Sequence, residues 1–288
     1  MNLAPGLLDL RPGRAGVVAA LMLLGGCAAP VAGPPPLLRA AAGQTRAGQE
    51  AYLTGRASES LPPLAEAVRL HLAAGDLPGA ARALLNLALA QRAAGDTQAA
   101  AASAARLRDL TPAALQQAAE GAGKEGPDPG LSIATVWLDA LLADDRGDFP
   151  AAAGLLGSVT DKLPAASPWT GRLETLRAAL ALGEDRPAEA LIHARAGQTA
   201  CAAARDQAEE ARAWRLAGTA QMRLGQWPGA RADFLASLRI EETLGAGARM
   251  AGDLRQLALI AGQLGDDAGA RLYAQRAVAI DSARSRGP

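Results

Sequence analysis

The sequence predicts an all-α protein, an α-solenoid of antiparallel helix pairs. Half of the residues are hydrophobic but only 3% are aromatic, and alanine, which favours helix and allows close helix packing, is abundant. Alternating patterns typical of strands are almost absent, whereas helical patterns recur. Glycine-containing turns return at regular intervals of roughly 40 residues, which is typical of repeated helix pairs.

The N-terminal segment 1–26 has the order of a secretory signal peptide. Arg11 and Arg14 come before an apolar run at 15–26, and small residues end that run. The run is well short of the roughly 20 residues that a helix needs to cross a bilayer. We therefore expect residues 1–26 to direct export and then to be removed.

Cys27 closes this run in the sequence Leu24-Gly25-Gly26-Cys27, which resembles the lipobox of bacterial lipoproteins. The resemblance implies that Cys27 becomes the new N-terminus and is diacylated on sulfur, so that several acyl chains hold the protein firmly to the membrane. Ala28 stands where an inner-membrane retention signal has Asp, which by resemblance favours an outer-membrane lipoprotein facing the periplasm. A buried or amphipathic helix that ends in Cys is the alternative.

Residues 27–43 are expected to form the lipidated cysteine and a tether. They are rich in Pro and Ala and have no apolar period. Such a segment acts as an extended spacer of ~3.1 Å per residue. The folded part is predicted to begin at residue 44.

The turn glycines divide this folded part. Each is expected to end the first helix of a pair, and an alanine five positions later to lie where the second helix touches the first. Gly55 marks one turn less clearly, and Gly75 and Gly245 mark joins between pairs. The turn glycines and their alanines are Gly95, Gly147, Gly183, Gly225 and Gly265, with Ala100, Ala152, Ala188, Ala230 and Ala270.

A stretch without helical period, 120–130, interrupts this pattern and lengthens one interval. We interpret it as a loop or hinge. It separates an N-terminal block at 44–119 from a C-terminal block at 131–284.

The segment Trp214-x-x-Ala217-Gly218-x-x-Gln221, followed by Ala230-x-x-x-Phe234, resembles the tetratricopeptide repeat (TPR), with Ala and Gln where the family usually has Leu and Tyr. The resemblance covers most of 44–284. It is strong for 211–280 and 81–112 and weaker between 131 and 200. It implies a TPR-like solenoid whose first helices line a concave groove.

Carried over position by position, the resemblance gives the residues of a partner-binding groove. Guanidinium groups bind carboxylates with two hydrogen bonds, so we expect acidic or C-terminal carboxylate segments as ligands. Replacing Arg212, Arg215 and Arg223 by Ala is expected to weaken binding without unfolding the protein. A solvated arginine-rich face is the alternative. The groove residues are Arg82, Asn86, Arg92, Arg212, Arg215, Thr219, Arg223, Arg255 and Gln256.

No catalytic residue, metal site or cofactor is expected. His71 and His193 each stand alone on a predicted helix, without a second ligand or base in register. The acidic pairs 144–145 and 266–267 lie at turns, where Asp caps helices. If Cys27 is lipidated, Cys201 has no disulfide partner within the chain, and it is interpreted as a small buried hydrophobe. A disulfide to another molecule in the oxidising periplasm is the alternative. Arg plus Lys and Asp plus Glu number 29 each, which disfavours nucleic acid as a partner.

These features predict a non-enzymatic, membrane-anchored periplasmic adaptor that binds protein partners of the cell envelope. A narrower version is a pilotin-like assembly factor for an outer-membrane machine. A groove that binds glycans or other small ligands, or that works as an enzyme, is the alternative of a different class. A deep pocket with converging acidic groups or histidines would favour that alternative.

Overall fold

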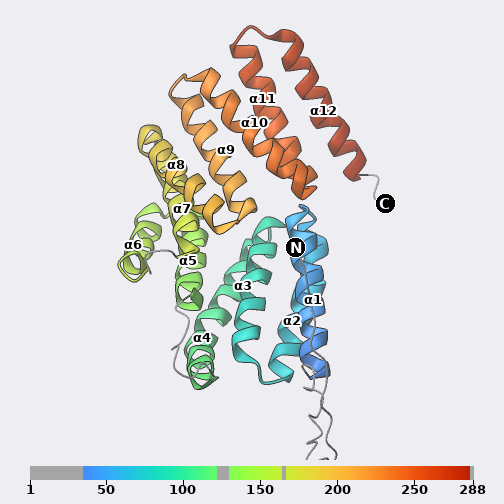
Figure 1. Ribbon diagram of the computed structural model, residues 1–288, viewed down its shortest axis with the longest axis vertical. Helices are drawn as coiled ribbons and strands as arrows, with labels where there is room; N and C mark the ends of the chain where they lie inside the picture. The colour runs from blue at the N-terminus through green and yellow to red at the C-terminus, as the bar shows by residue number, and fades with distance from the viewer. Residues whose placement is uncertain (1–34, 122–129, 164–166, 286–288) are drawn as a thin grey trace, which may run out of the picture. The chain divides into compact units, whose positions relative to one another are not determined.

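The computed structural model describes residues 35–121, 130–163 and 167–285, and within them it shows helices and no strand (Figure 1). The all-α prediction is confirmed. The proposed signal peptide, Cys27 and most of the 120–130 segment lie outside the described residues. The helices are α1 Pro36–Leu53, α2 Ala57–Ala73, α3 Leu77–Ala93, α4 Thr97–Gly121, α5 Gly130–Asp145, α6 Phe149–Thr160, α7 Trp169–Gly183, α8 Pro187–Ala204, α9 Gln207–Arg223, α10 Trp227–Leu244, α11 Gly247–Gln263 and α12 Asp267–Ser285.

The helices pack in succession as antiparallel pairs. Each helix lies against the next one along the chain, as the colour sequence in Figure 1 shows. The first helices of the pairs also contact one another, from α1 to α3, then α5, α7 and α9. This arrangement confirms the predicted α-solenoid.

The turns between helices combine a left-handed residue with a capping aspartate. Gly95 adopts φ +85°, a region that favours glycine, and the next residue, Asp96, accepts a hydrogen bond from the Ala99 N–H at 2.9 Å. Asp76 and Asp148 cap α3 and α6 in the same way. The Gly-Asp sequence therefore ends one helix and starts the next.

The predicted turn at Gly183 is wrong by two positions. Gly183 is the last residue of α7, and Asp185 takes the left-handed conformation, with φ +56°. Asp is one of the few residues with a side chain that tolerates this region. The alanine five positions after Asp185 is Ala190, which is fully buried, whereas Ala188 is exposed.

At three other turns the predicted contact alanine is fully buried: Ala100, Ala152 and Ala230. Ala270, in the last pair, is only partly buried.

The N-terminal boundary also needs correction, because α1 begins at Pro36 and not at residue 44. Proline suits the first turn of a helix, where its missing N–H costs nothing. Ala41 is fully buried, and Gly48 lies so close to Leu64 of α2 that a Cβ would overlap that side chain. Residues 36–43 therefore belong to the solenoid and not to the tether.

The hydrophobic core runs through the proposed boundary between two blocks. One cluster of buried side chains extends from Leu64 in α2 to Leu180 in α7. On either side of 122–129, the hydroxyl groups of Thr111 and Thr135 lie 3.0 Å apart. Residues on both sides of the boundary thus share one core. None of the described helices is both long and apolar enough to cross a bilayer.

Candidate functional site

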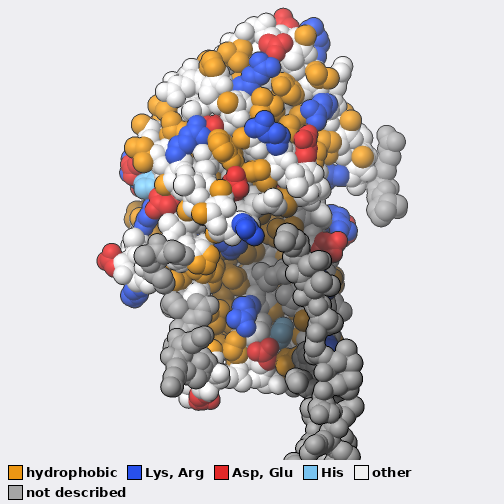
Figure 2. Space-filling view, in the orientation of Figure 1, with side chains coloured by type: hydrophobic (Ala, Val, Ile, Leu, Met, Phe, Trp, Pro, Cys, Tyr) orange, Lys and Arg blue, Asp and Glu red, His pale blue; other side chains and the backbone are white. Residues whose placement is uncertain are grey.

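A cavity of about 1130 Å³ lies against the first helices of the pairs. Every first helix from α1 to α11 supplies at least one side chain to it, whereas the second helices supply only Ala57 and Phe234. Figure 2 shows basic side chains standing among hydrophobic ones on one face of the molecule. One representative from each first helix is Gln49, Asn86, Trp137, Arg172, Thr219 and Gln256.

The structure brings most of the predicted groove residues to this cavity. Arg82 instead lines a second cavity of about 700 Å³. Arg255 lines neither of the two, and its guanidinium binds Asp281 of α12. The predicted residues that line the larger cavity are Asn86, Arg92, Arg212, Arg215, Thr219, Arg223 and Gln256.

The arginines of the cavity bind acceptors of their own chain. Arg92 donates two hydrogen bonds to Asp145, at 2.5 and 2.7 Å. Arg223 donates to the Leu182 carbonyl at 2.5 Å. Arg212 has no such short contact, and its hydrogen bond to Glu209 is 3.4 Å long. Most of these guanidinium groups therefore hold helix pairs together.

Two fully buried carboxylates lie at the α10–α11 side of the cavity. Glu241 accepts hydrogen bonds from Arg215 at 2.5 Å and from Arg249 at 2.7 Å. Asp253 accepts one from Ser237 at 2.7 Å, but its Oδ1 has no hydrogen-bond partner among the described residues. Burial raises the pKa of Asp253 to about 6, although Arg215 and the Ser237 hydroxyl act in the opposite direction.

This buried network contradicts the expectation that Arg212, Arg215 and Arg223 can be replaced by Ala without unfolding the protein. Arg215 cannot be removed as a neutral surface residue, because its loss takes one of two cations from a buried carboxylate. The expectation that the variant lacking Arg212, Arg215 and Arg223 keeps its fold is therefore withdrawn.

Arg172, which lines both cavities, lies beside two tryptophans, Trp137 of the larger cavity and Trp169 of the smaller one. The Arg172 guanidinium lies 5.4 Å from the Trp137 ring centroid and 5.1 Å from that of Trp169. Its Nε also donates to Asp206 at 2.8 Å. Trp137 is 1% exposed and borders the larger cavity. The partly buried side chains of Leu89 and Leu216 give the larger cavity an apolar part beside its charged one.

Three amide side chains of the cavity are free to bind a ligand. Gln49, Asn86 and Gln256 line it, and none of them has a hydrogen bond to another described residue. A side-chain amide both donates and accepts hydrogen bonds, as a peptide group does. The cavity can therefore bind a polypeptide backbone.

The turn between α1 and α2 reaches this cavity and contacts α11. Arg249 Nη2 donates to the Leu53 carbonyl at 2.5 Å. A Cβ placed on Gly55 would lie 3.7 Å from the Ala248 Cβ. Tyr52 lines the cavity beside them, and burial together with nearby Glu209 raises the pKa of its hydroxyl. The contact joins residues 196 positions apart in the sequence, so no local sequence pattern could predict it.

Sequence reasoning missed Trp137, Arg172, Arg249 and Asp253 as cavity residues. The first two lie in the region where the resemblance was weak. Arg249 and Asp253 lie in the first helix of the last pair, within 211–280, where the resemblance is strong. Their distance from Gly265 equals that of Glu209 and Ala213 from Gly225, which is the signal that could have placed them.

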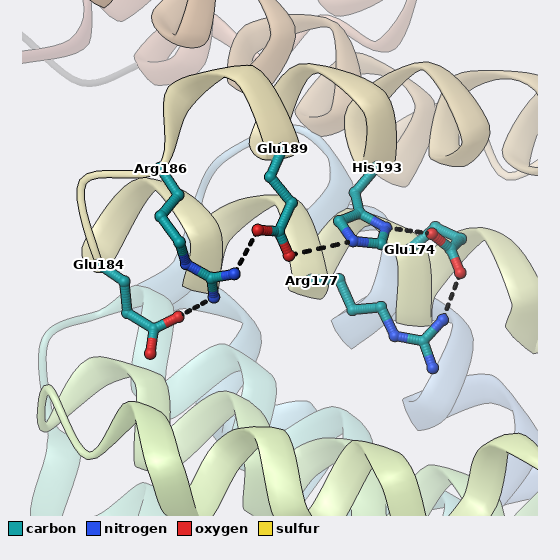
Figure 3. A network of polar contacts seen from close by, with 6 residues as sticks. All are labelled: Glu174, Arg177, Glu184, Arg186, Glu189 and His193. Atoms are coloured by element: carbon teal, nitrogen blue, oxygen red, sulfur yellow. Dashed lines mark hydrogen bonds and ion pairs between the residues drawn. The ribbon is translucent and has the colours of Figure 1, made fainter.

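The two histidines belong to local polar contacts. His71 Nδ1 lies 2.8 Å from Asp76. His193 lies between two glutamates, with Nδ1 2.7 Å from Glu174 and Nε2 3.8 Å from Glu189. Figure 3 shows this second network, which links α7, the following turn and α8 through Glu174, Arg177, Glu184, Arg186, Glu189 and His193.

Comparisons with known proteins give a likeness of fold. No protein-family model matches the chain, and no curated protein matches it. The crystal structure of BtubC (BKLC) from P. vanneervenii is similar, with a TM-score of 0.54 and 17% sequence identity, over 87% of this chain and 93% of that one. At this identity the likeness concerns the arrangement of the chain and not its activity.

Proposed function

We propose that this protein is a lipid-anchored adaptor of the TPR type, held at the outer membrane through Cys27, that binds an extended segment of an envelope protein in its larger cavity. The observation that carries the proposal is the convergence of all first helices on one cavity that holds free amides. A fold alone does not assign a function, so the proposal depends on these side chains.

The chemistry of the cavity suits a polypeptide segment. Asn86 on α3 and Gln256 on α11 stand on different pairs, so a ligand that binds both amides is held by repeats distant in the sequence. The partly buried side chains of Leu89, Leu216 and Met222 supply apolar surface for the side chains of such a segment. Backbone hydrogen bonds together with apolar contacts supply affinity, and the side chains in contact supply specificity.

The preference for acidic segments that the sequence suggested now depends mainly on Arg212. An acidic ligand has to compete with Asp145 for Arg92 and with Glu241 for Arg215, and both internal contacts are short. Arg212, at 3.4 Å from Glu209, has the weakest internal hydrogen bond of this group. We expect one carboxylate of the partner at this position.

A cavity variant tests the proposal. Replacing Asn86 and Gln256 by Ala removes the amides without disturbing any ion pair described above. Affinity purification after cross-linking in intact membranes should recover a partner with the wild type and at least tenfold less of it with the double variant. Replacing Gln98 and Gln263, which are exposed and line neither cavity, is the matched control and should leave recovery unchanged. Equal recovery from both double variants would overturn the cavity as the binding site.

The anchor is tested separately. Cys27→Ser removes the thiol that takes the lipid, so the variant should remain uncleaved and lack acyl chains. Mass spectrometry of the wild-type N-terminus should show an acylated Cys27, and the protein should resist salt extraction but yield to detergent. An unmodified Cys27, or a mature chain that still begins at Met1, would contradict the envelope assignment.

A further inference from the structure

The last helix pair repeats an ion pair of the pair before it. Arg215 of α9 binds Glu241 of α10, and Arg255 of α11 binds Asp281 of α12. Arg255 follows Arg215 in the sequence by the same number of residues as Asp281 follows Glu241. The two helix pairs can therefore be compared position by position.

The comparison shows which positions of the last pair lack a cover. Glu241 is 0% exposed, whereas Asp281 is 38% exposed. Leu238 of α10 is 4% exposed, whereas its counterpart Val278 is 64% exposed. The uncovered face of α11 and α12 therefore includes an apolar side chain and a carboxylate that the preceding pair buries.

Helix α11 covers these positions in the preceding pair. Its Arg249 donates to Glu241 at 2.7 Å, and its Leu254 and Leu257 pack with Leu238 in one apolar cluster. A helix that covers α12 in the same way needs a basic residue in the place of Arg249 and small or apolar residues on the same face. Such a helix would neutralise Asp281 and bury Val278.

Helix α1 of this chain has these properties. Arg39 precedes Gly55 by the same interval at which Arg249 precedes Gly265, so the two arginines occupy the same position of the repeat. Arg39 is exposed and has no ion pair with another described residue. Ala40 and Ala47, at the positions of Met250 and Leu257, are also exposed. Their small side chains leave room for Val278 of a neighbouring molecule.

We propose that two copies of this protein associate head to tail, with α1 of one copy packed on the outward face of α11 and α12 of the other. Arg39 of the first copy then pairs with Asp281 of the second, as Arg249 pairs with Glu241 inside each chain. The two surfaces differ, so the contact is heterologous and can be repeated by further copies. The association does not depend on the peptide-binding cavity.

Two variants of α12 provide a matched test. Val278 and Leu272 are both exposed apolar residues, at 64% and 55%, but only Val278 has a buried counterpart in α10, because Ala232, the counterpart of Leu272, is exposed. Light scattering of the purified full chain in detergent should show a mass that rises with protein concentration. Val278→Glu should raise the dissociation constant at least tenfold, and Leu272→Glu should leave it within about twofold.

Charge exchange tests the register of the contact. Arg39→Glu and Asp281→Arg should each weaken association at least fivefold, and a mixture of the two variants should regain it, with circular dichroism used to verify folding. A wild type that is monomeric at every concentration, or equal effects of the two α12 substitutions, overturns the proposal. So does a wild-type monomer whose Val278→Glu variant loses an envelope partner, because that result assigns this face to another protein.

Discussion

At the scale of single residues, Asp253 shows how the cavity affects stability. Its carboxylate is fully buried, and its pKa is raised to about 6, whereas an exposed Asp titrates near 3.9. The folded state therefore binds this proton more tightly than the unfolded state does. The free energy of unfolding falls as pH rises from about 4 to above 6, by about 3 kcal/mol at most for a shift of this size.

Asp253→Asn should remove this pH dependence. The side-chain oxygen of the asparagine can still accept the hydrogen bond from the Ser237 hydroxyl, and the side chain carries no charge at this buried position. We expect a free energy of unfolding at pH 7.5 that is about 1–3 kcal/mol higher than in the wild type, and a difference that disappears near pH 4. Urea denaturation at the two pH values measures it. Asp109→Asn, at an exposed position, is the control and should change neither value.

At the scale of helices, close packing depends on particular glycines. A Cβ on Gly171 of α7 would lie 2.5 Å from the Cys201 sulfur and 2.8 Å from the Cys201 nitrogen of α8. Because one of these two atoms belongs to the α8 backbone, a side-chain rotation cannot make room for the Cβ, and α7 and α8 would have to move apart. Burial raises the pKa of Cys201 to about 12, consistent with an inert thiol packed in this contact.

Gly171→Ala should therefore lower the free energy of unfolding by about 1–3 kcal/mol through overpacking. Gly154 of α6 offers the matched control, because a Cβ there has no neighbour within 4 Å. Gly154→Ala should raise stability by about 0.5–1 kcal/mol through helix propensity alone. Equal effects of the two substitutions, measured by chemical denaturation, would show that α7 and α8 do not approach as described.

The turns allow a second comparison at this scale. Asp185 adopts φ +56° and is 89% exposed at its side chain, so Asp185→Gly should relieve backbone strain at little loss of contact. Gly225 adopts φ +71°, so a side chain introduced there would create the strain that Asp185→Gly removes. We expect Asp185→Gly to raise the free energy of unfolding by about 1 kcal/mol and Gly225→Ala to lower it by a similar amount. The melting temperatures should shift in the same directions. Thermal unfolding followed by circular dichroism gives both values.

These turns also show how far the sequence predicts the fold. Gly225 and Gly265 are found from sequence because glycine, alanine and their spacing agree. Asp185 is not, because Gly183 offered a better left-handed residue two positions earlier. In the cavity, the repeat register placed Arg92 correctly, but its engagement depends on Asp145, 53 residues away. Register predicts where a side chain points and leaves its distant partner undetermined.

At the scale of the whole solenoid, the contact between the α1–α2 turn and α11 couples distant repeats. In a solenoid, each repeat normally contacts only its neighbours, and the terminal repeats open most easily. Here Leu53 and Gly55 are held against Arg249 and Ala248. The first pair should therefore be more protected than a free end.

Ala248→Glu should break this contact, because a larger charged side chain faces the turn at Gly55. Native-state hydrogen exchange of residues 50–56 should then become at least tenfold faster, and exchange in α7 and α8 should stay unchanged. Ala232→Glu, on the exposed face of α10, is the control. Unchanged exchange at 50–56 in the Ala248 variant would mean that the turn does not depend on α11.

The same contact has a consequence for the order of folding. Helix pairs form from residues close in sequence and so assemble fast, whereas bringing Leu53 to Arg249 closes a loop of about 200 residues. By the logarithmic dependence on loop length, the entropic cost of that closure is about 5 kcal/mol before the chain between them is ordered, and it falls once the intervening helices have formed. The pairs should thus appear early in refolding, and the Leu53–Arg249 contact should form in the last step.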